Sequence, residues 1–194
     1  MAYYTLGQMR SAAKTDTIHE SAGSQLRHSA RSGPYDIFLS HSFQDAEVIL
    51  GIKRTLERTG QSVYVDWAED PQLSRQYVTK DTARRLRDRM RESTSFIFAT
   101  SNASPDSKWM PWELGYFDGL RNSESIAIMP IVDYRNERFV GQEYLGLYPK
   151  IEDLPMRTSL SLRVPTVTRR IGESLETRSL AQFARGERTY SRRY

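Results

Sequence analysis

The middle of the chain alternates short apolar runs with longer segments in which apolar residues recur every three or four positions. Runs of the first kind are typical of buried β-strands, and those of the second kind are typical of amphipathic helices. The pattern predicts strands over residues 35–42, 62–67, 94–101 and 125–132, and helices over 45–60, 79–93 and from residue 107 onward. Such alternation implies parallel strands. We therefore expect an α/β fold of the flavodoxin-like kind, an open parallel β-sheet with helices on both faces.

The two ends of the chain carry weaker patterns. Thr5 is a candidate cap for a short helix in TLGQMRSAA, and Asp45 is a candidate cap for the helix over 45–60, which Gly60 would stop. After residue 133 we expect a short edge strand within 144–152 and a last amphipathic helix within 174–186. The pattern divides the chain into an N-terminal extension or linker (1–34), a central domain (35–153) and a basic C-terminal extension with a helix (154–194).

Length and composition narrow the class of protein. The 194 residues suit one domain with a real core, and 27% of them are charged. The absence of cysteine excludes disulfides and Cys-zinc sites. With only three histidines in the chain, we do not expect a histidine-based metal site. No apolar run approaches the roughly 18 residues of a membrane span, and the start of the chain lacks the pattern of a signal peptide. We expect a cytoplasmic protein that does not enter a membrane.

The positive charge is concentrated at the end of the chain. The net charge is +4, and the segment from Pro155 onward holds nine arginines against three glutamates. A basic tail of this kind occurs in nucleic-acid-binding proteins, but a solvated helix and a frayed terminus produce it as well. We favour the second interpretation and do not expect nucleic-acid binding. The run RRLRDRMR (84–91) is interpreted in the same way, as a solvated helix face.

An open parallel sheet predicts where a ligand binds. Ligands of such sheets lie outside the carboxyl ends of the strands, near the point where the strand order reverses. The residues expected at this edge are Ser40, His41, Ser42, Asp66, Trp67, Ser101, Asn102 and the helix start from Trp109 to Glu113. Neither a GxxxxGK[ST] loop nor a GxGxxG motif occurs, which excludes a Walker NTPase and an ordinary dinucleotide-binding Rossmann domain. The acidic cluster of a phospho-receiver domain is also missing from its place.

Three segments, in this order and spacing, resemble the TIR (Toll/interleukin-1 receptor) domain family, most closely its stand-alone bacterial members. They are YDIFLSHSFQDAE, VYVDWAED and SFIFATSNASPDSKWMPWEL, and the resemblance covers about residues 35–150. The opening strand that ends in FLSHS is one signal. The W-x-x-x-E pattern, here Trp109 and Glu113, is the more informative one.

The resemblance implies an enzyme that consumes NAD+. In the enzymatic branch of the family the glutamate at the place of Glu113 is catalytic, and adaptor TIR domains commonly lack it. The products would be nicotinamide and ADP-ribose or a cyclic or variant ADP-ribose, with NAD+ as a substrate and no cofactor. Cleavage of the N-glycosidic bond builds oxocarbenium-like charge on the ribose, which one fixed carboxylate stabilises. Nicotinamide leaves as a neutral molecule, so no general acid is required.

Each other candidate has a functional and an ordinary interpretation. His41 would contact the ribose or the phosphates, or would be a histidine with satisfied hydrogen bonds at a strand end. Ser40 and Ser42 would line the pocket or close the turn, and Asp66 would bind a ribose hydroxyl or cap a loop. Aromatic faces could hold nicotinamide or adenine by stacking. The candidates for substrate contacts are therefore Ser40, His41, Ser42, Asp66, Trp67, Arg75 and Trp109, with Glu113 catalytic and Arg75 a phosphate contact.

Several hypotheses follow. The leading one is an NAD+ glycohydrolase or cyclase of antiphage defence, which self-associates through the loop over about residues 66–76 and works with a separate sensor or effector protein. The alternative is a non-enzymatic interaction module that assembles with other TIR domains. A deoxyribosyl transferase, which would process nucleosides and ignore NAD+, is a further alternative.

Overall fold

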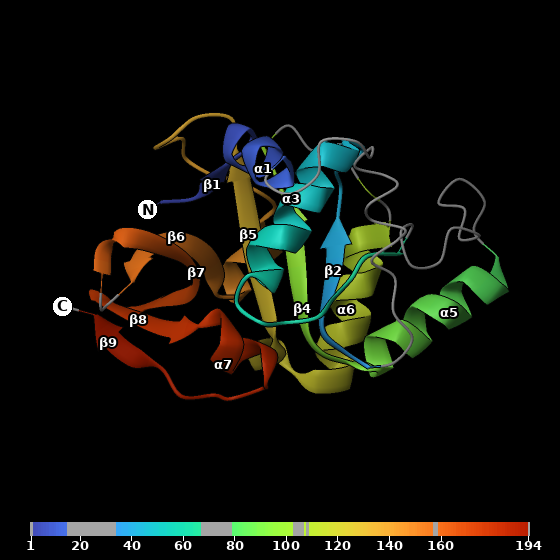
Figure 1. The fold of residues 1–194 in the computed structure, drawn as a ribbon. Helices are drawn as coiled ribbons and strands as arrows, with labels where there is room; N and C mark the ends of the chain where they lie inside the picture. Colours follow the sequence, from blue (N-terminus) through green and yellow to red (C-terminus); the bar gives the residue numbers. More distant parts are fainter. Residues whose placement is uncertain are drawn as a thin grey trace.

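The computed structural model describes residues 2–14, 34–66, 79–102, 107, 109–156 and 159–193. In these residues a nine-stranded sheet has the order β3-β2-β4-β5-β6-β7-β8-β9, with β1 paired to β5 (Figure 1). Each pair of neighbours within the order β3-β2-β4-β5-β6 is parallel, so the predicted open parallel sheet is confirmed. These parallel strands are β2 (Tyr35–His41), β3 (Val63–Tyr64), β4 (Ser93–Thr100), β5 (Ile126–Val132) and β6 (Lys150–Met156).

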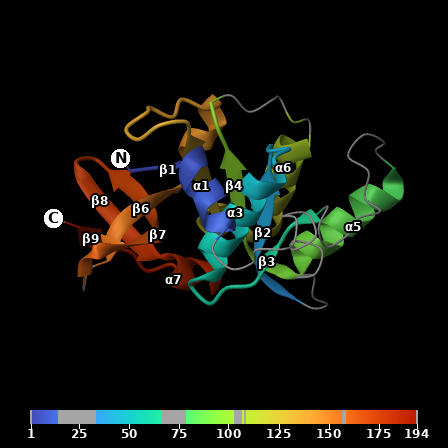
Figure 2. The same ribbon diagram turned by 45° about the horizontal axis from the view of Figure 1, so that its top comes forward.

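Helices cover both faces of the sheet, as the sequence predicts. They are α1 (Leu6–Ala13), α3 (Ala46–Glu57), α5 (Lys80–Arg91), α6 (Trp109–Arg121) and α7 (Leu180–Ala184). Figures 1 and 2 show α1 and α3 on one side of the central strands and α6 on the other. Because side chains alternate along a strand, Ile37 and Leu39 of β2 enter the core under α3, while Phe38 enters the core under α5 and α6.

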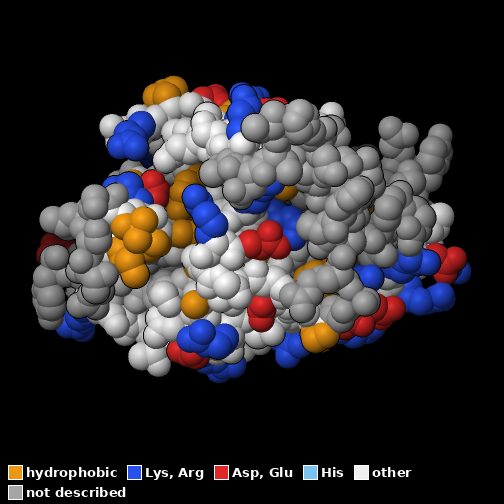
Figure 3. All heavy atoms as spheres, in the orientation of Figure 1, with side chains coloured by type: hydrophobic (Ala, Val, Ile, Leu, Met, Phe, Trp, Pro, Cys, Tyr) orange, Lys and Arg blue, Asp and Glu red, His pale blue; other side chains and the backbone are white. Residues whose placement is uncertain are grey.

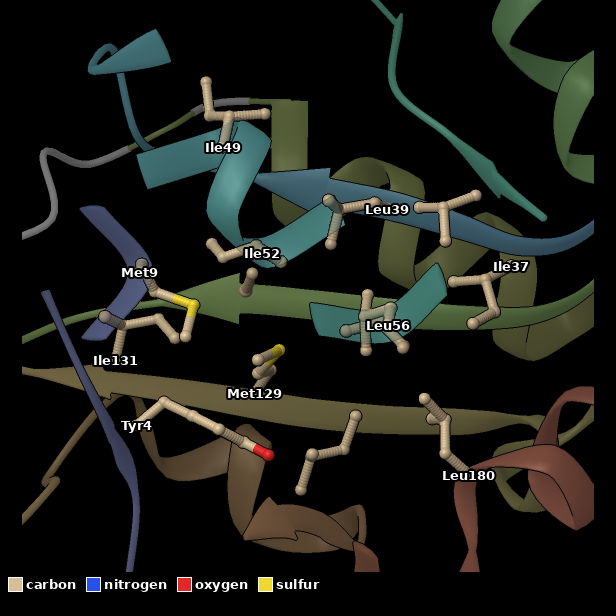
Figure 4. Packing of buried hydrophobic residues seen from close by; sticks show 14 of the residues in the cluster. Tyr4, Met9, Ile37, Leu39, Ile49, Ile52, Leu56, Met129, Ile131 and Leu180 are labelled. Carbon is tan, nitrogen blue, oxygen red and sulfur yellow. The ribbon is translucent and has the colours of Figure 1, made fainter. Parts of the chain in front are cut away.

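Local capping signals place the helix starts. The Asp45 carboxylate accepts hydrogen bonds from the N–H groups of Glu47 and Val48, which confirms the predicted cap of α3. Thr5 caps α1, and the Gln8 side chain accepts in turn from the Thr5 N–H in a capping box. Figure 4 shows side chains of α1, α3 and the strands meeting in one apolar layer, Met9 and Ile52 among them.

The N-terminal segment is part of this body. Strand β1 (Tyr4–Thr5) pairs in parallel with β5. The backbone of Ala2 is fixed at β6, where its N–H donates to Glu152 Oε2 at 3.1 Å and its oxygen accepts from the Asp153 N–H at 2.7 Å. Helix α1 lies directly on α3, where a Cβ on Gly51 would come within 1.9 Å of the Met9 carbonyl oxygen.

The C-terminal part differs from the prediction of a single final helix. Residues 150–193 hold antiparallel strands that extend the sheet: β6 is followed by β7 (Ser159–Ile171), β8 (Ser174–Ser179) and β9 (Ser191–Arg193). The helix expected within 174–186 is confined to α7, because Gly172 turns the chain with a φ of 59° and β8 pairs back on β7. The short strand expected within 144–152 begins at Lys150 and is interior. The three-segment division of the chain stays a prediction.

One arginine of the basic tail is structural. Arg178 is 2% exposed, and its guanidinium donates to the backbone oxygens of Glu124 and Glu187. Glu124 belongs to a short 3-10 helix, η1 (Ser123–Ser125), and a second one, η2 (Glu143–Leu147), precedes β6. The guanidinium also faces the rings of Phe183 and Tyr190. The tail therefore uses part of its charge for packing.

Within the described residues, no helix is both long enough and apolar enough to cross a membrane.

Candidate active site

The candidate site lies where the carboxyl ends of β2 and β4 meet the start of α6. The Ser107 hydroxyl accepts a hydrogen bond from the Met110 N–H at 3.3 Å, which confirms the predicted opening of this helix. Pro111 fits the first turn because an N–H there would have no partner within the helix. Glu113 begins the second turn and is only 1% exposed.

Glu113 and Ser40 form the central contact of the site. The Ser40 hydroxyl, near the end of β2, donates a hydrogen bond to Glu113 Oε2 over 2.5 Å. This length is typical of an O–H donor bound to a carboxylate, which is stronger than a bond between neutral groups. Both side chains are buried, so the bond fixes one oxygen of the carboxylate against the sheet. The sequence predicted that these residues share an edge, and the structure brings them into contact.

His41 and Asp66 form a second buried pair beside Ser40. His41 Nδ1 lies 3.1 Å from the backbone oxygen of Phe43, and Nε2 lies 3.6 Å from Asp66 Oδ1. A backbone oxygen only accepts, so Nδ1 carries a hydrogen and the ring orientation is fixed. The structure therefore brings together two residues that the sequence could only place at neighbouring strand ends. Their contact with a substrate stays a prediction.

A cavity of about 500 Å³ opens at the same edge of the sheet, within the usual size range of small-molecule pockets. Ser42 lines it, together with the end of β4 and the first turn of α6, including Met110 and Pro111. Residues 140–142 and Tyr144 form the opposite wall. The sequence does not predict this wall, because the segment after residue 133 has no clear helical or alternating pattern.

Asn102 fastens that wall to the end of β4. Its Nδ2 donates to Glu137 Oε1 at 2.8 Å and to the Arg138 oxygen at 2.9 Å, and its Oδ1 accepts from the Val140 N–H at 3.0 Å. The hydrogen bond from Asn102, followed by one from the Asp133 N–H, lowers the pKa of the Glu137 carboxyl. The expected position of Asn102 at a strand end was informative, although its partners were not predicted.

The tryptophans of α6 lie in an aromatic row. Trp109 meets Trp112 edge-on with ring centroids 5.3 Å apart, and Trp112 stacks on Tyr116 at 6.0 Å. The Arg87 guanidinium of α5 lies 5.2 Å from the Trp112 ring. Trp109 is thus half-buried in ring contacts, and its predicted role in stacking on a substrate stays a prediction. Phe117, one turn after Glu113, is buried against Phe96 at 5.2 Å.

Two predicted site residues, Trp67 and Arg75, lie outside the described residues, as does nearly all of the predicted assembly loop over residues 66–76. In the described part of the chain, no group of three or more His, Cys, Asp and Glu side chains could hold a metal ion. The described site is therefore a buried carboxylate with a hydroxyl donor, next to an open cavity.

Two known proteins are similar to this chain in sequence. A protein of Bacillus cereus (strain MSX-D12), named as a probable 3' cyclic ADP-D-ribose synthase ThsB', is 55% identical over 118 residues, which cover 60% of this chain and 60% of that protein. A protein of Cytobacillus dafuensis, named as a putative cyclic ADP-D-ribose synthase TIR2, is 35% identical over 83 residues, or 42% of this chain and 22% of that protein. The match thus spans less than two thirds of either relative.

The family model of the TIR domain matches residues 37–148, which is more than half of the chain and contains every element of the site described above. Strands β3, β4 and β5, the FLSHS strand end and the glutamate of α6 all fall within this range. The chain belongs to the TIR domain family.

Proposed function

We propose that this chain is an NAD+-consuming enzyme that breaks the bond between nicotinamide and ribose, with Glu113 as its catalytic carboxylate. The observation that carries the proposal is the bond from Ser40 to Glu113, at the sheet edge where a cavity opens. A carboxylate held in one position among buried side chains interacts more strongly with a cation than one in water, because the surrounding dielectric constant is lower. Both relatives are named for products made from such a reaction.

The chemistry requires one anionic group. As the C–N bond breaks, its electron pair leaves with nicotinamide, and positive charge develops on C1' and the ring oxygen of the ribose. The Glu113 carboxylate would stabilise that charge in the transition state more than in the bound substrate. Nicotinamide departs neutral and needs no proton. The Ser40 hydroxyl would hold the carboxylate in the orientation required.

We further propose that the main product is a cyclic ADP-ribose. A nucleophile of the same molecule would attack C1' and release a proton, which gives nicotinamide, a cyclic product and H+. Attack by water would give ADP-ribose instead. The names of the two relatives support cyclisation. A site that excludes water would favour attack by the same molecule, and the burial of Glu113 is consistent with such a site.

The burial of Glu113 also supports a proposal about activation. At 1% exposure the carboxylate cannot touch a ribose until the atoms that cover it move. We propose that self-association of TIR domains accompanies this movement, and that the chain is least active as a monomer. A separate sensor or effector protein and a role in antiviral defence are part of the same proposal. Protection of cells against phage, lost on Glu113→Gln, would test that role.

Nicotinamide release from NAD+ tests the proposal directly. The wild-type chain, dilute and at high concentration, is compared with Glu113→Gln, which keeps the shape of the side chain and removes its charge. Glu173→Gln, in the exposed turn between β7 and β8, is the matched control. We expect release by the wild type and the control, and a loss of at least about 100-fold in Glu113→Gln. Mass analysis of the nucleotide products separates cyclisation from hydrolysis.

The opposite results are equally informative. Equal release by a folded Glu113→Gln variant would remove Glu113 from the mechanism. Absence of release from an enforced assembly of the wild type would favour the alternative, a TIR interaction module without activity. Release from nucleosides with NAD+ untouched would indicate a deoxyribosyl transferase.

A further inference from the structure

A second cavity lies in a different part of the molecule. A groove of about 580 Å³ opens where α1, the end of α3 and the β6–β7 pair meet. Figure 3 looks onto this face and shows basic side chains beside apolar ones in this area. The polar side chains that line the groove are Tyr4, Gln8, Ser11, Thr55, Arg58, Asp153 and Arg163.

On one wall of the groove, the negative charge of Asp153 is paired with an arginine. The Asp153 carboxylate is 5% exposed and accepts a hydrogen bond from Arg163 Nε at 2.8 Å. Gln8 Nε2 reaches the same oxygen at 3.4 Å. Burial, followed by the charge of Asp153, raises the pKa of Tyr4, so Tyr4 remains a neutral donor. The charge of Asp153 is thus offset within the protein.

The opposite wall holds Arg58, whose positive charge has no acidic partner among the described residues. Arg58 follows α3 directly, is exposed, and lines the groove. Among the residues that the structure describes, no acidic side chain pairs with its guanidinium. A guanidinium presents several N–H donors in one plane, which suits the oxygens of a phosphate or a carboxylate.

Thr55 supplies an independent sign of a ligand. It is 1% exposed and lines the groove one turn before Arg58, and its hydroxyl makes no hydrogen bond within the described part of the chain. Buried hydroxyl groups almost always have a hydrogen-bond partner, because a buried donor without one raises the free energy of the folded state. A ligand atom in the groove would provide the missing partner.

We propose that this groove binds a small phosphomonoester, with its phosphate on Arg58 and, after the side chains that cover it move, on the Thr55 hydroxyl. The phosphate oxygens accept from both donors. The groove, at about 580 Å³, is much larger than a phosphate ion, which makes a sugar phosphate a better fit than phosphate alone. The site is separate from Glu113 and does not depend on the proposed activity.

Calorimetry with the full chain tests the proposal, using inorganic phosphate and ribose 5-phosphate as probes. We expect both to bind, ribose 5-phosphate more tightly, and we expect Arg58→Gln to weaken binding at least about tenfold. Arg188→Gln, at an exposed arginine near the C-terminus, is the control and should bind as the wild type does. Glu113→Gln should also bind normally, which separates this site from the catalytic proposal.

Thr55→Val is the sharper variant, because it removes the hydroxyl and keeps the shape. We expect it to weaken both probes while the melting temperature stays equal or rises, since an unpaired buried hydroxyl is lost. Failure of the wild type to bind either probe at about 10 mM would overturn the proposal. Binding by Arg58→Gln equal to that of Arg188→Gln would overturn it as well.

Discussion

Ser40 and Glu113 are 73 residues apart in the chain, and the serine hydroxyl lies 2.5 Å from the glutamate Oε2. The strand β2 presents the hydroxyl, and α6 presents the carboxylate. A contact between two elements sets the geometry of the candidate site, so changes on either element should affect the same reaction step.

The first prediction concerns Ser40 as a positioning residue. Ser40→Ala removes one hydrogen bond from Glu113, and we expect kcat for nicotinamide release to fall about tenfold or more with little change in KM. Ser40→Thr keeps the hydroxyl and should restore part of the rate. Ser95→Ala is the control, because Ser95 is also buried and its hydroxyl bonds the Asp36 oxygen at 2.8 Å, on the same sheet. A rate for Ser40→Ala equal to that of the control would contradict the assignment.

The second prediction concerns the wall of the cavity. Asn102→Ala removes the acceptor of the Val140 N–H, so hydrogen exchange at that amide should speed up. A looser wall should also raise KM for NAD+ about three- to tenfold. Arg135→Ala, in the same exposed segment, should change neither quantity. Unchanged exchange at Val140 in the Asn102 variant would show that other contacts hold the wall.

The third prediction concerns the close packing of α1 against α3 at Gly51. Gly51→Ala would place a Cβ within 1.9 Å of the Met9 carbonyl oxygen, so α1 must shift. We expect a loss of about 1–3 kcal/mol in the free energy of unfolding. Gly115→Ala is the matched control, since its Cβ meets no atom within 4 Å, and alanine there should be neutral or stabilise by up to about 1 kcal/mol. Equal melting temperatures for the two variants would argue against close packing of α1.

The fourth prediction concerns the buried arginine of the tail. Arg178→Gln shortens the side chain and leaves the Glu124 and Glu187 oxygens without its donors. We expect a loss of about 2–4 kcal/mol in chemical denaturation. Arg188→Gln should stay within about 0.5 kcal/mol of the wild type. A small effect at Arg178 would mean that water replaces the guanidinium at low cost.

The fifth prediction concerns alkaline pH. Burial first, and then the charge of Asp118, raise the pKa of Tyr148 from 10.0 to about 12, and its hydroxyl donates to Asp118 Oδ2 at 3.2 Å. Because the folded pKa lies above the unfolded one, this stabilisation is complete below pH 10 and is lost as the pH rises to about 12. Tyr148→Phe should make the stability less dependent on pH in that window. A pH titration of tyrosinate absorbance in the folded wild type checks this, and a pKa of Tyr148 at the ordinary value of 10.0 would contradict the prediction.

The sequence predicted the central sheet well, because each signal there is local. The Asp45 cap, the apolar run of β4 and the start of α6 near Ser107 depend on neighbours within a few positions. The prediction of a single final helix does not include the β7–β8 hairpin, although Gly172 marks its turn, because the basic charge of the tail carries no information on strand pairing.

Parts of the site could not be predicted for a different reason. The wall at Val140 is held by Asn102, 38 residues earlier, and no periodic pattern records that bond. The pairing of His41 with Asp66 depends on how the end of β2 and the segment that follows β3 lie relative to each other. Such contacts depend on the assembled tertiary structure.

The attachment of the N-terminal strand has a consequence for the order of folding. Ala2 is bonded to Glu152, 150 residues later, and β1 completes its pairing only on β5. During synthesis the first residues must therefore wait, unpaired, until most of the chain has left the ribosome. Contacts between such distant residues form late and slowly, so we expect β1 to pair with β5 late in the folding of this molecule.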